Sequence, residues 1–385
     1  MLKFYDLVVV GAGILGLGTA LAGVRAGKSV CVIERDARAN GASVRNFGFV
    51  TVAGQMAGPH WRRARRSRDV WAEVAPQAGI AILQEGQMLP AYREEAATLL
   101  HDYLALPEMG AECRLLTREE ALSRIPNLRI DGLRDVLLSA PDLRVESREA
   151  LPKLAAWLEK SQGVDFRFGT AVLEVTARGV VTSAGEISAG AVVVCPGDDF
   201  ATLYPEISRE AALQKCTLQM LRVAADGMPK LQSAVMSDHS LARYDGFRAL
   251  PRAESLIARL EREAPAHRAA GVHLIVVQSA DGSLVVGDSH VYGPAVEPFA
   301  TADFDDLIMG LFDEVIDQPN RRIIGHWTGS YASASDRRVL MARPEPHVRV
   351  AMITGGTGAS TSFAFGEEII ADLFGTSTHL PEDLQ

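Results

Sequence analysis

The 385-residue sequence has few cysteines and no histidine pattern typical of metal binding. Its four cysteines are scattered and form no CxxC pair, which excludes the common zinc-site spacings and a disulfide scaffold. The nine histidines contain no HxxxH pair, so we expect no metal ion. Scattered thiols fit a reducing compartment, and we therefore expect a cytoplasmic protein.

The sequence also lacks an excess of positive charge. It has 39 Lys and Arg residues against 48 Asp and Glu residues, a formal net charge of −9. Such a chain repels the phosphates of DNA and RNA, so we expect no nucleic-acid partner. A small anionic ligand stays possible, because the field inside a pocket can differ from the net charge. The length predicts two or three compact units, and the sequence predicts no particular oligomeric state.

One long uncharged run, Leu7–Val24, reaches the length of a membrane-spanning helix. Glycines interrupt it, among them Gly11, Gly13, Gly16 and Gly18. A buried strand, a tight turn and a packed helix give the same hydropathy, so we expect neither a transmembrane segment nor a signal peptide.

This run contains a GxGxxG motif in the context of a dinucleotide-binding site. The motif, residues 11–16, follows a predicted strand, Phe4–Val10, and precedes a predicted helix, Leu17–Gly27. A second predicted strand, Ser29–Ile33, ends at the acidic residue Glu34. An acidic residue about 20 positions after the first glycine is expected to bind ribose hydroxyls.

The chemistry of the motif assigns a role to each glycine. Gly11 permits the tight turn, Gly13 lets the backbone approach a pyrophosphate, and Gly16 lets the helix pack on the strand. The helix start offers free N–H groups to the phosphates. The predicted cofactor contacts in this segment are Gly11, Gly13, Ile14, Leu15, Gly16, Glu34 and Arg35.

The motif alone does not separate NAD from FAD, but the rest of the chain does. After the second strand comes a polar segment, Arg35–Gly48, rather than further βαβ units. A glycine-rich strand–turn–helix pattern returns only near residue 350, with a predicted helix over Ser362–Leu373. A long, buried flavin that contacts distant segments fits this order better than a nicotinamide cofactor.

Four motifs spread over almost the whole chain carry a family resemblance. They are Gly11–Glu34, Gly41–Gly48, Ala191–Gly197 with Val172 upstream, and Gly355–Ser360. The chain resembles the D-amino-acid oxidase superfamily of FAD-dependent amine and amino-acid oxidases, which includes glycine oxidase and sarcosine oxidase. The resemblance implies further FAD contacts from Ser43, Asn46, Gly48, Val172, Gly197, Gly356, Thr357, Gly358 and Ser360.

The resemblance also implies how the FAD is held. The Gly355–Ser360 turn and the helix start after it are expected to stabilise the negative charge of reduced flavin. Sarcosine oxidase relatives bond the flavin through a cysteine, whereas this chain has Gly329 and Ser330 at the matching positions. We therefore expect non-covalent FAD.

The fold class implied by the resemblance is α/β, with two interleaved domains. A Rossmann-like FAD-binding domain is expected beside an α+β substrate domain built on a mostly antiparallel sheet. The predicted FAD-binding segments are 1–78, 144–212 and 328–385, and the predicted substrate segments are 79–143 and 213–327.

The implied reaction is oxidation of a small amine by hydride transfer to flavin N5, followed by imine hydrolysis. Relatives that oxidise amino acids usually have an arginine near position 331 for the substrate carboxylate, whereas this chain has Tyr331. The chain looks closest to a subgroup found beside aminophosphonate catabolism genes. This likeness predicts an amine with an anionic group, such as a 2-aminoethylphosphonate derivative, bound by Arg45, Tyr331 and His290.

Each of these residues has an alternative interpretation. Arg45 is equally suited to clamping the pyrophosphate, Tyr331 to packing in a core, and His290 to a structural hydrogen bond. Arg337 and Arg338, which follow Asp336, are further candidates for substrate or for surface ion pairs. The arginine-rich run 62–68 is expected to face solvent or acidic neighbours, because its arginines fall all around a helix.

Two other functions stay open from the sequence. The first is a glycine-, sarcosine- or D-amino-acid-type oxidase. The second is a non-catalytic flavin-binding subunit of a larger complex.

Overall fold

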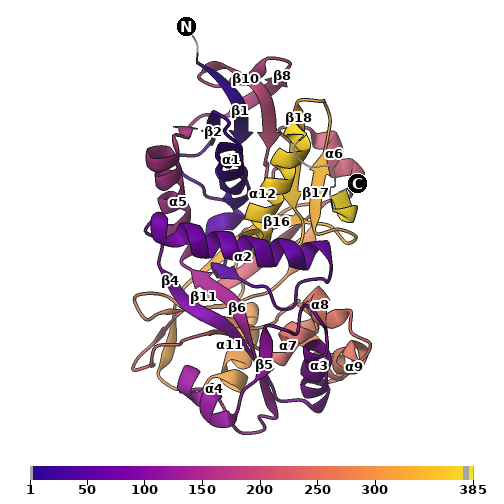
Figure 1. Cartoon of the computed structure of the whole chain (residues 1–385). Coiled ribbons are helices and arrows are strands. Elements are labelled where there is room, and N and C mark those ends of the chain that lie inside the picture. The colour runs from indigo at the N-terminus through magenta and orange to yellow at the C-terminus, as the bar shows by residue number, and fades with distance from the viewer. Residues whose placement is uncertain (1–2, 376–380, 385) are drawn as a thin grey trace.

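Two β-sheets organise the chain in the computed structural model, which describes residues 3–375 and 381–384. In Figure 1, β1, β2, β10 and β18 lie in the upper part of the molecule and β4, β6 and β11 in the lower part. The observed α/β architecture confirms the predicted fold class.

The first sheet has the strand order β17-β18-β10-β1-β2-β7, and β8 and β9 extend it beside β10. The pairs β18–β10, β10–β1, β1–β2 and β2–β7 are parallel. Its strands are β1 (Phe4–Val10), β2 (Val30–Ile33), β7 (Asp165–Arg167), β8 (Val172–Thr176), β9 (Gly179–Thr182), β10 (Gly185–Val194), β17 (Val339–Ala342) and β18 (Val348–Ile353).

The central strands of this sheet are apolar because both faces are covered. Leu7 and Val9 of β1 join one buried cluster, and Val8 joins another on the opposite face. The helices of the first cluster are α1 (Ile14–Arg25), α2 (Pro59–Gln77), α5 (Ser147–Gln162) and α12 (Gly358–Phe374). The opposite face is covered in part by α6 (Pro205–Glu210).

The second sheet has the order β15-β11-β14-β13-β12-β4-β6-β3, with β16 beside β11 and β5 beside β6. The β12–β4 pair is parallel, and the other pairs in the described residues are antiparallel. Its strands are β3 (Phe49–Val50), β4 (Ile82–Ala91), β5 (Cys113–Leu115), β6 (Asp135–Val145), β11 (Gln214–Ala225), β12 (Ala234–Met236), β13 (Ile275–Gln278), β14 (Leu284–Gly287), β15 (Val291–Gly293) and β16 (Arg321–Ser333).

Helices cover both faces of the second sheet. Residues of α3 and α9 join one buried cluster, and residues of α4 and α11 join another. The helices of this region are α3 (Glu94–Leu104), α4 (Arg118–Arg124), α7 (Asp238–Leu241), α8 (Asp245–Arg248), α9 (Ala253–Glu263), α10 (Pro265–Ala269) and α11 (Ala302–Val315). Two 3₁₀ turns complete the described elements, η1 (Ala42–Val44) and η2 (Glu382–Leu384).

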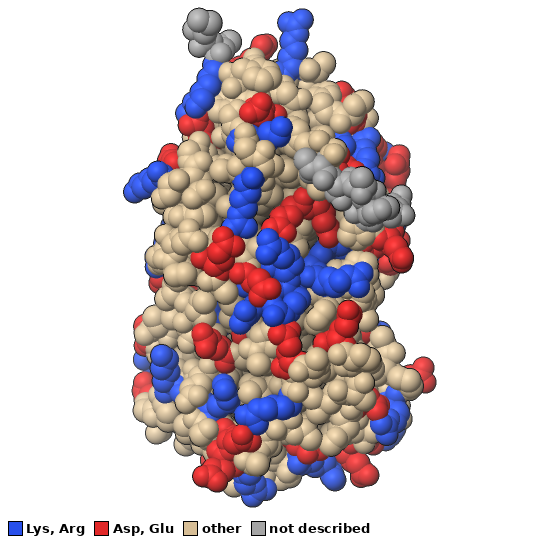
Figure 2. Space-filling model, in the orientation of Figure 1, with Lys and Arg blue, Asp and Glu red and all other residues tan. Residues whose placement is uncertain are grey.

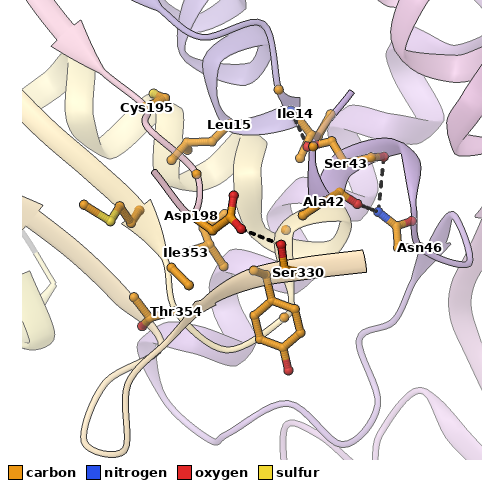
Figure 3. A pocket seen from close by; sticks show the side chains of 18 of the residues that line it. Ile14, Leu15, Ala42, Ser43, Asn46, Cys195, Asp198, Ser330, Ile353 and Thr354 are labelled. Carbon is orange, nitrogen blue, oxygen red and sulfur yellow. Dashed lines mark hydrogen bonds between the residues drawn. The ribbon is translucent and has the colours of Figure 1, made fainter. Parts of the chain in front are cut away.

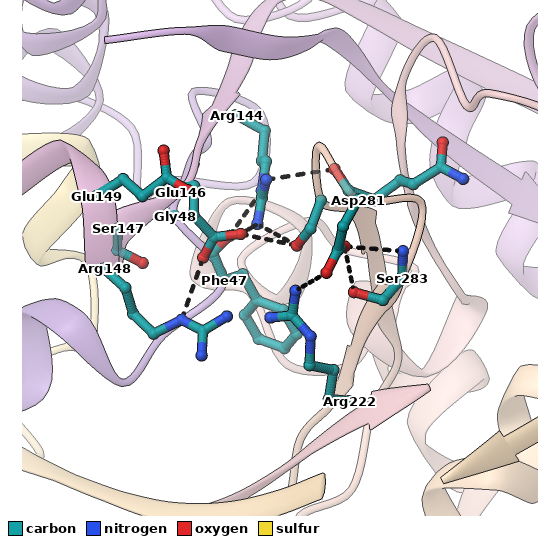
Figure 4. A network of polar contacts seen from close by, with 12 residues as sticks. Phe47, Gly48, Arg144, Glu146, Ser147, Arg148, Glu149, Arg222, Asp281 and Ser283 are labelled. Carbon is teal, nitrogen blue, oxygen red and sulfur yellow. Dashed lines mark hydrogen bonds and ion pairs between the residues drawn. The ribbon is translucent and has the colours of Figure 1, made fainter. Parts of the chain in front are cut away.

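A buried arginine joins segments that lie far apart in the sequence (Figure 4). Arg144, near the end of β6, donates hydrogen bonds to the carbonyl oxygens of Phe47 at 3.1 Å and Gln278 at 3.2 Å. Arg144 also forms an ion pair of 2.9 Å with Glu146. The same carboxylate accepts a hydrogen bond of 2.7 Å from Ser279, so a compact network ties the loop before β3 to the β13–β14 turn.

Several predicted boundaries differ from the structure. β3 belongs to the second sheet although it falls in a segment predicted for FAD binding, and β16 crosses the predicted boundary at 328. α1 begins at Ile14 rather than Leu17, and α12 begins at Gly358 rather than Ser362. Both helices therefore start directly at their glycine turns. The described residues contain no helix with the length and apolarity that a membrane crossing requires.

Candidate active site

A cavity of about 610 Å³ is lined by residues from both sheets. The carboxyl ends of three parallel strands, β1, β2 and β10, reach it through Val10, Ile33 and Val194, and β18 contributes Ile353. Ligands of open parallel sheets bind at this edge, and the volume is within the range of cofactor and ligand pockets.

The first glycine turn leaves a helix end open to the cavity. Gly11 has a φ of +102°, and a Cβ atom at Gly16 would lie 1.9 Å from the Gly11 carbonyl oxygen. Gly13 is the N-cap of α1 and supplies no side-chain cap. The Ile14 N–H instead donates to Ser43 Oγ at 3.0 Å, as Figure 3 shows. Apart from this one contact, a helix start that its own N-cap residue does not cap is a site for phosphate oxygens.

Glu34 lies beside this turn, at the end of β2. Its carboxylate accepts hydrogen bonds from Ala12 N at 2.9 Å and Asp36 N at 3.0 Å. A carboxylate has about four acceptor positions, so capacity for ribose hydroxyls remains. Arg35 lines the cavity and forms an ion pair of 2.6 Å with Asp199.

The loop before β3 is shaped by Asn46. Its amide nitrogen donates to the carbonyl oxygens of Ala42 at 2.9 Å and Ser43 at 3.2 Å, and its amide oxygen accepts from Gly48 N at 2.7 Å. Gly48 does not line the cavity, contrary to the predicted cofactor contact. Its φ is +68°, and a Cβ atom there would lie 1.7 Å from the Val145 carbonyl oxygen, so this glycine serves close packing against the end of β6.

A second glycine turn brings the start of α12 to the same cavity. Gly356 has a φ of +70°, and a Cβ atom there would lie 2.9 Å from the ring of Tyr331. Thr357 is the N-cap, and its hydroxyl lies 3.2 Å from Nε2 of His60 rather than capping the helix. Ser360 lines the cavity and accepts a hydrogen bond of 2.9 Å from Thr51 N.

The structure brings the other predicted residues together. Apart from Gly48, every predicted cofactor residue lines the cavity, and so do Arg45, Tyr331 and His290. The five arginines of α2 do not line it, whereas four of them contact acidic side chains: Arg63 with Glu368 and Asp383, Arg65 with Asp69 and Glu112, Arg66 with Glu367, and Arg68 with Asp69. Figure 2 shows basic and acidic atoms side by side across the middle of this face, where α2 runs.

A half-buried arginine that the sequence did not single out lies in this cavity. Arg243 donates hydrogen bonds to the hydroxyl oxygens of Tyr331 at 3.3 Å and Tyr292 at 3.2 Å. Among the described residues, no carboxylate forms an ion pair with it. Burial lowers the pKa of Arg243, but the surrounding Tyr331, Tyr292 and Asp288 outweigh burial and raise it, so the guanidinium stays charged.

Three further lining residues form a buried cluster, His273, Asp288 and His290. His273 Nε2 lies 3.1 Å from Asp288 Oδ1, and His290 Nε2 lies 3.7 Å from Asp288 Oδ2. Burial lowers the pKa of His290 to about 3 and also lowers the pKa of His273. Both imidazoles are therefore neutral at pH 7, which makes His290 a poor partner for an anion.

Two other candidate arginines are engaged elsewhere. Arg337 is exposed, pairs with Asp336 at 2.6 Å and does not line the cavity. Arg338 lines the cavity but forms an ion pair with Asp245 at 2.5 Å. No local motif marks Arg243, His273 or Asp288. Each comes from a separate loop: Arg243 lies between α7 and α8, His273 before β13, and Asp288 after β14.

A family model described as FAD dependent oxidoreductase matches residues 6–373. The chain belongs to this family. FAD is its cofactor, and the enzyme is an FAD-dependent oxidoreductase whose relatives include a glycine oxidase.

Individual relatives of this FAD-dependent oxidoreductase are distant. Glycine oxidase of Geobacillus kaustophilus (strain HTA426) is 25% identical over 299 residues, covering 70% of this chain and 77% of that protein. The crystal structure of glycine oxidase from Geobacillus kaustophilus superposes with a TM-score of 0.76 at 19% identity, covering 98% of this chain and 96% of that one. The crystal structure of L-proline dehydrogenase from P. horikoshii gives 0.79 at 20% identity, covering 99% and 96%. The two structural likenesses show the shared fold.

The residues of the oxidoreductase fit FAD. Two helix starts whose N-cap residues, Gly13 and Thr357, make no side-chain cap line one cavity. Gly16 lacks a Cβ atom where one would collide with the turn, and Glu34 lies beside that turn. When bound, FAD supplies the hydride acceptor, and the protein supplies binding and orientation.

Proposed function

We propose that this enzyme oxidises a small amine that carries an anionic group. The observation that carries the proposal is Arg243, a charged guanidinium in the cavity with tyrosine hydroxyls beside it and no carboxylate partner among the described residues. A half-buried charge without an ion-pair partner is free to bind an anion, and the charge of Asp288 acts on Arg243 only from beyond ion-pair distance, so a substrate anion is the natural partner.

The neighbours of Arg243 support this proposal. Guanidinium N–H groups form a planar fork that matches carboxylate or phosphonate oxygens. Tyr331 and Tyr292 each offer a hydroxyl donor to the same anion. Burial raises the pKa of Tyr331 well above its usual value, so its hydroxyl keeps its proton.

Arg45 is a second candidate for the anion. It lines the cavity, and its Cβ atom lies 3.2 Å from the position that a Cβ at Gly329 would occupy. Because Gly329 has no Cβ atom, β16 leaves space for Arg45 at this position. A phosphonate has three oxygens and up to two charges, and two arginines would suit it better than they suit a carboxylate.

The finer substrate proposal is an aminophosphonate such as a 2-aminoethylphosphonate derivative. The FAD is proposed to be non-covalent, because Gly329 and Ser330 offer no thiol for a flavin bond. In the proposed reaction the residues around Arg243 hold the anion, which fixes the carbon that loses hydride. The imine formed by this loss is hydrolysed by water to an aldehyde or oxo product.

A glycine- or sarcosine-type oxidase is the second candidate, because a curated relative is a glycine oxidase and Arg243 suits a carboxylate equally well. Anaerobic titrations watched at the flavin absorbance separate the candidates. The panel is 2-aminoethylphosphonate, its N-methyl derivative, glycine, sarcosine, D-alanine and ethylamine. Bleaching by the phosphonates supports the finer proposal, and bleaching by the amino acids alone overturns it.

Ethylamine tests the anionic group itself. Bleaching by ethylamine as fast as by the anionic amines would remove the basis of the proposal. No bleaching by any amine would favour the non-catalytic flavin-binding subunit.

The variant Arg243→Gln tests the assigned anchor. We expect the KM for the best anionic amine to rise roughly 10- to 150-fold, because a hydrogen bond to a charged group contributes about 1.5–3 kcal/mol. Arg337→Gln is the matched control, since Arg337 is exposed and outside the cavity. An unchanged KM in a correctly folded, FAD-loaded Arg243→Gln enzyme would contradict the assignment.

A further inference from the structure

The His273–Asp288–His290 cluster has a hydrogen-bonding pattern that leaves three acceptors facing one point. The candidate ligand atoms of the three side chains lie within 4.8 Å of one another, and all three residues are buried. They line the same cavity as Arg243. Asp288 Oδ1 also lacks a hydrogen bond of good geometry.

The tautomer of His290 follows from its backbone partner. Nδ1 of His290 lies 3.0 Å from the Gly271 carbonyl oxygen, which can only accept a hydrogen bond. Nδ1 therefore carries the proton, and in the neutral ring Nε2 carries a lone pair. That lone pair faces the Asp288 carboxylate at 3.7 Å, too far for a hydrogen bond.

The tautomer of His273 follows from two successive hydrogen bonds that involve Ser240. Ser240 donates its hydroxyl proton to the Leu274 carbonyl oxygen at 2.9 Å. Its oxygen therefore accepts a hydrogen bond from Nδ1 of His273, 3.0 Å away. Nε2 of the neutral His273 ring is then also a bare acceptor, and it faces Asp288 Oδ1 at 3.1 Å.

Three acceptors that converge in a buried place repel one another unless a donor or a cation lies between them. A water molecule has two O–H donors and leaves one acceptor unpaired. A primary ammonium group has three N–H donors and one positive charge, which match two imidazoles and one carboxylate. The positive charge of Arg243 acts on the same group, and it opposes a metal dication more strongly than a singly charged ammonium group.

We infer that His273, Asp288 and His290 form the subsite for the ammonium head of the substrate, opposite the anion held by Arg243. This inference rests on the proposed function. The two subsites together select a zwitterion with one positive and one negative end. The three residues act in binding and positioning, and the inferred role of His290 is as an acceptor for the amine rather than as a donor to the anion.

Ligand pairs that differ only in the amine test the subsite. The dissociation constants of 2-aminoethylphosphonate and ethylphosphonate are measured from the flavin spectrum under anaerobic conditions, with glycine and acetate as the carboxylate pair. We expect the amine to tighten binding roughly ten-fold or more in the wild-type enzyme. Asp288→Asn should weaken the amine-bearing ligand by a similar factor and leave ethylphosphonate within about two-fold.

The outcomes separate the two proposals. If neither ethylphosphonate nor acetate binds, the anion site at Arg243 is wrong. If these anions bind, but the amine adds nothing or Asp288→Asn weakens both members of a pair equally, the ammonium subsite is wrong. Asp336→Asn is the matched control, since Asp336 is exposed and outside the cavity.

The pH dependence of flavin reduction distinguishes loss of the charge of Asp288 from a structural defect. Hydride leaves only the neutral amine, and the charge of Asp288 raises the pKa of a bound ammonium. We expect the midpoint of the rate of flavin reduction to lie roughly 1–3 pH units lower in Asp288→Asn. The other titratable or charged side chains around Asp288 are His273, His290, Arg243, Tyr244 and Cys216.

A second variant keeps the test decisive if Asp288→Asn fails to fold. His290→Gln replaces the lone pair of Nε2 with an amide and should weaken only the amine-bearing ligand. Elemental analysis of the purified holoenzyme tests whether the three residues bind a metal ion instead of an ammonium group. One equivalent of a transition metal that is lost in His290→Gln would overturn the ammonium subsite.

Discussion

A methyl group at position 16 would lie 1.9 Å from the Gly11 carbonyl oxygen, far inside van der Waals contact. Gly16→Ala must therefore displace the turn that faces the predicted pyrophosphate. We expect the variant to lose most of its bound FAD and to be destabilised by about 1–3 kcal/mol, as in other overpacked sites. FAD content after gel filtration and the thermal midpoint are the measurements.

The control for this prediction is Gly310→Ala. Gly310 lies inside α11, and no heavy atom lies within 4 Å of the position of its Cβ. Alanine is a better helix former than glycine by about 1 kcal/mol, so the control should be unchanged or slightly more stable. Equal loss of FAD in both variants would show that the Gly16 contact is not the cause.

A local motif marks some single residues of the cavity. Gly11, Gly13 and Gly16 all line it, and the close contact of Gly16 is with Gly11 in the same turn, whereas Gly11 and Gly13 also lie close to Cys195 and Ser43. Gly48 shows the limit, since its glycine is required by Val145, about a hundred positions away. Arg243 shows the opposite limit, because nothing near it in the sequence marks it as a cavity residue.

At the scale of elements, α2 is fixed by a buried ion-pair network rather than by substrate. Arg63 is 1% exposed and contacts Glu368 of α12 at 2.7 Å and Asp383 at 2.5 Å. Removing one partner of a buried network leaves the others uncompensated. We expect Arg63→Met to lower the free energy of unfolding by about 3–5 kcal/mol, measured by urea unfolding.

The comparison variant on the same helix is Arg66→Met. Arg66 is exposed and pairs with Glu367, and exposed pairs contribute about 0–1 kcal/mol. Neither arginine lines the cavity, so the KM for amines should stay constant in both. A KM change in Arg66→Met with stability intact would show that the arginine-rich run 62–68 acts on substrate.

Element types were easier to predict than element ends. The strand Phe4–Val10 was predicted with the bounds that β1 has, since a continuous apolar run marks a buried parallel strand. The starts of α1 and α12 were placed three to four residues late, because the sequence does not show which residues after a glycine turn already have helical dihedrals. That difference matters, since the helix starts face the cavity.

At the scale of the whole molecule, buried histidines couple stability to pH. Burial lowers the pKa of His239 to about 3 and of His60 to about 4. An unfolded histidine has a pKa near 6.5, so the unfolded state binds more protons below that pH. The enzyme should therefore lose stability as the pH falls from 6.5 toward 4.

The variant His239→Leu isolates one such group. Both ring nitrogens of His239 are buried without hydrogen bonds, so leucine leaves no polar partner unpaired. Each buried neutral histidine costs about 1.4 kcal/mol per pH unit below 6.5, or about 2 kcal/mol at pH 5. Urea unfolding at pH 7 and pH 5 should show that the variant loses about that much less than wild type.

Exposed His101 supplies the control for this measurement. His101→Gln is the matched substitution of a histidine whose ring is exposed. A His239→Leu enzyme with the wild-type dependence would show that His239 is protonated in the folded state.

The sequence by itself determined the cofactor half of this protein. Glycine turns, the strand before the first of them and the acidic residue after β2 are local patterns, and backbone geometry makes them specific for a dinucleotide. Only the tertiary structure brought together the residues of the proposed substrate site. Arg243, His273 and Asp288 come from segments with no shared motif, and the second sheet and its connections bring them together. Their charges and tautomers depend on burial and on partners such as Ser240 and Gly271, which chain order does not reveal.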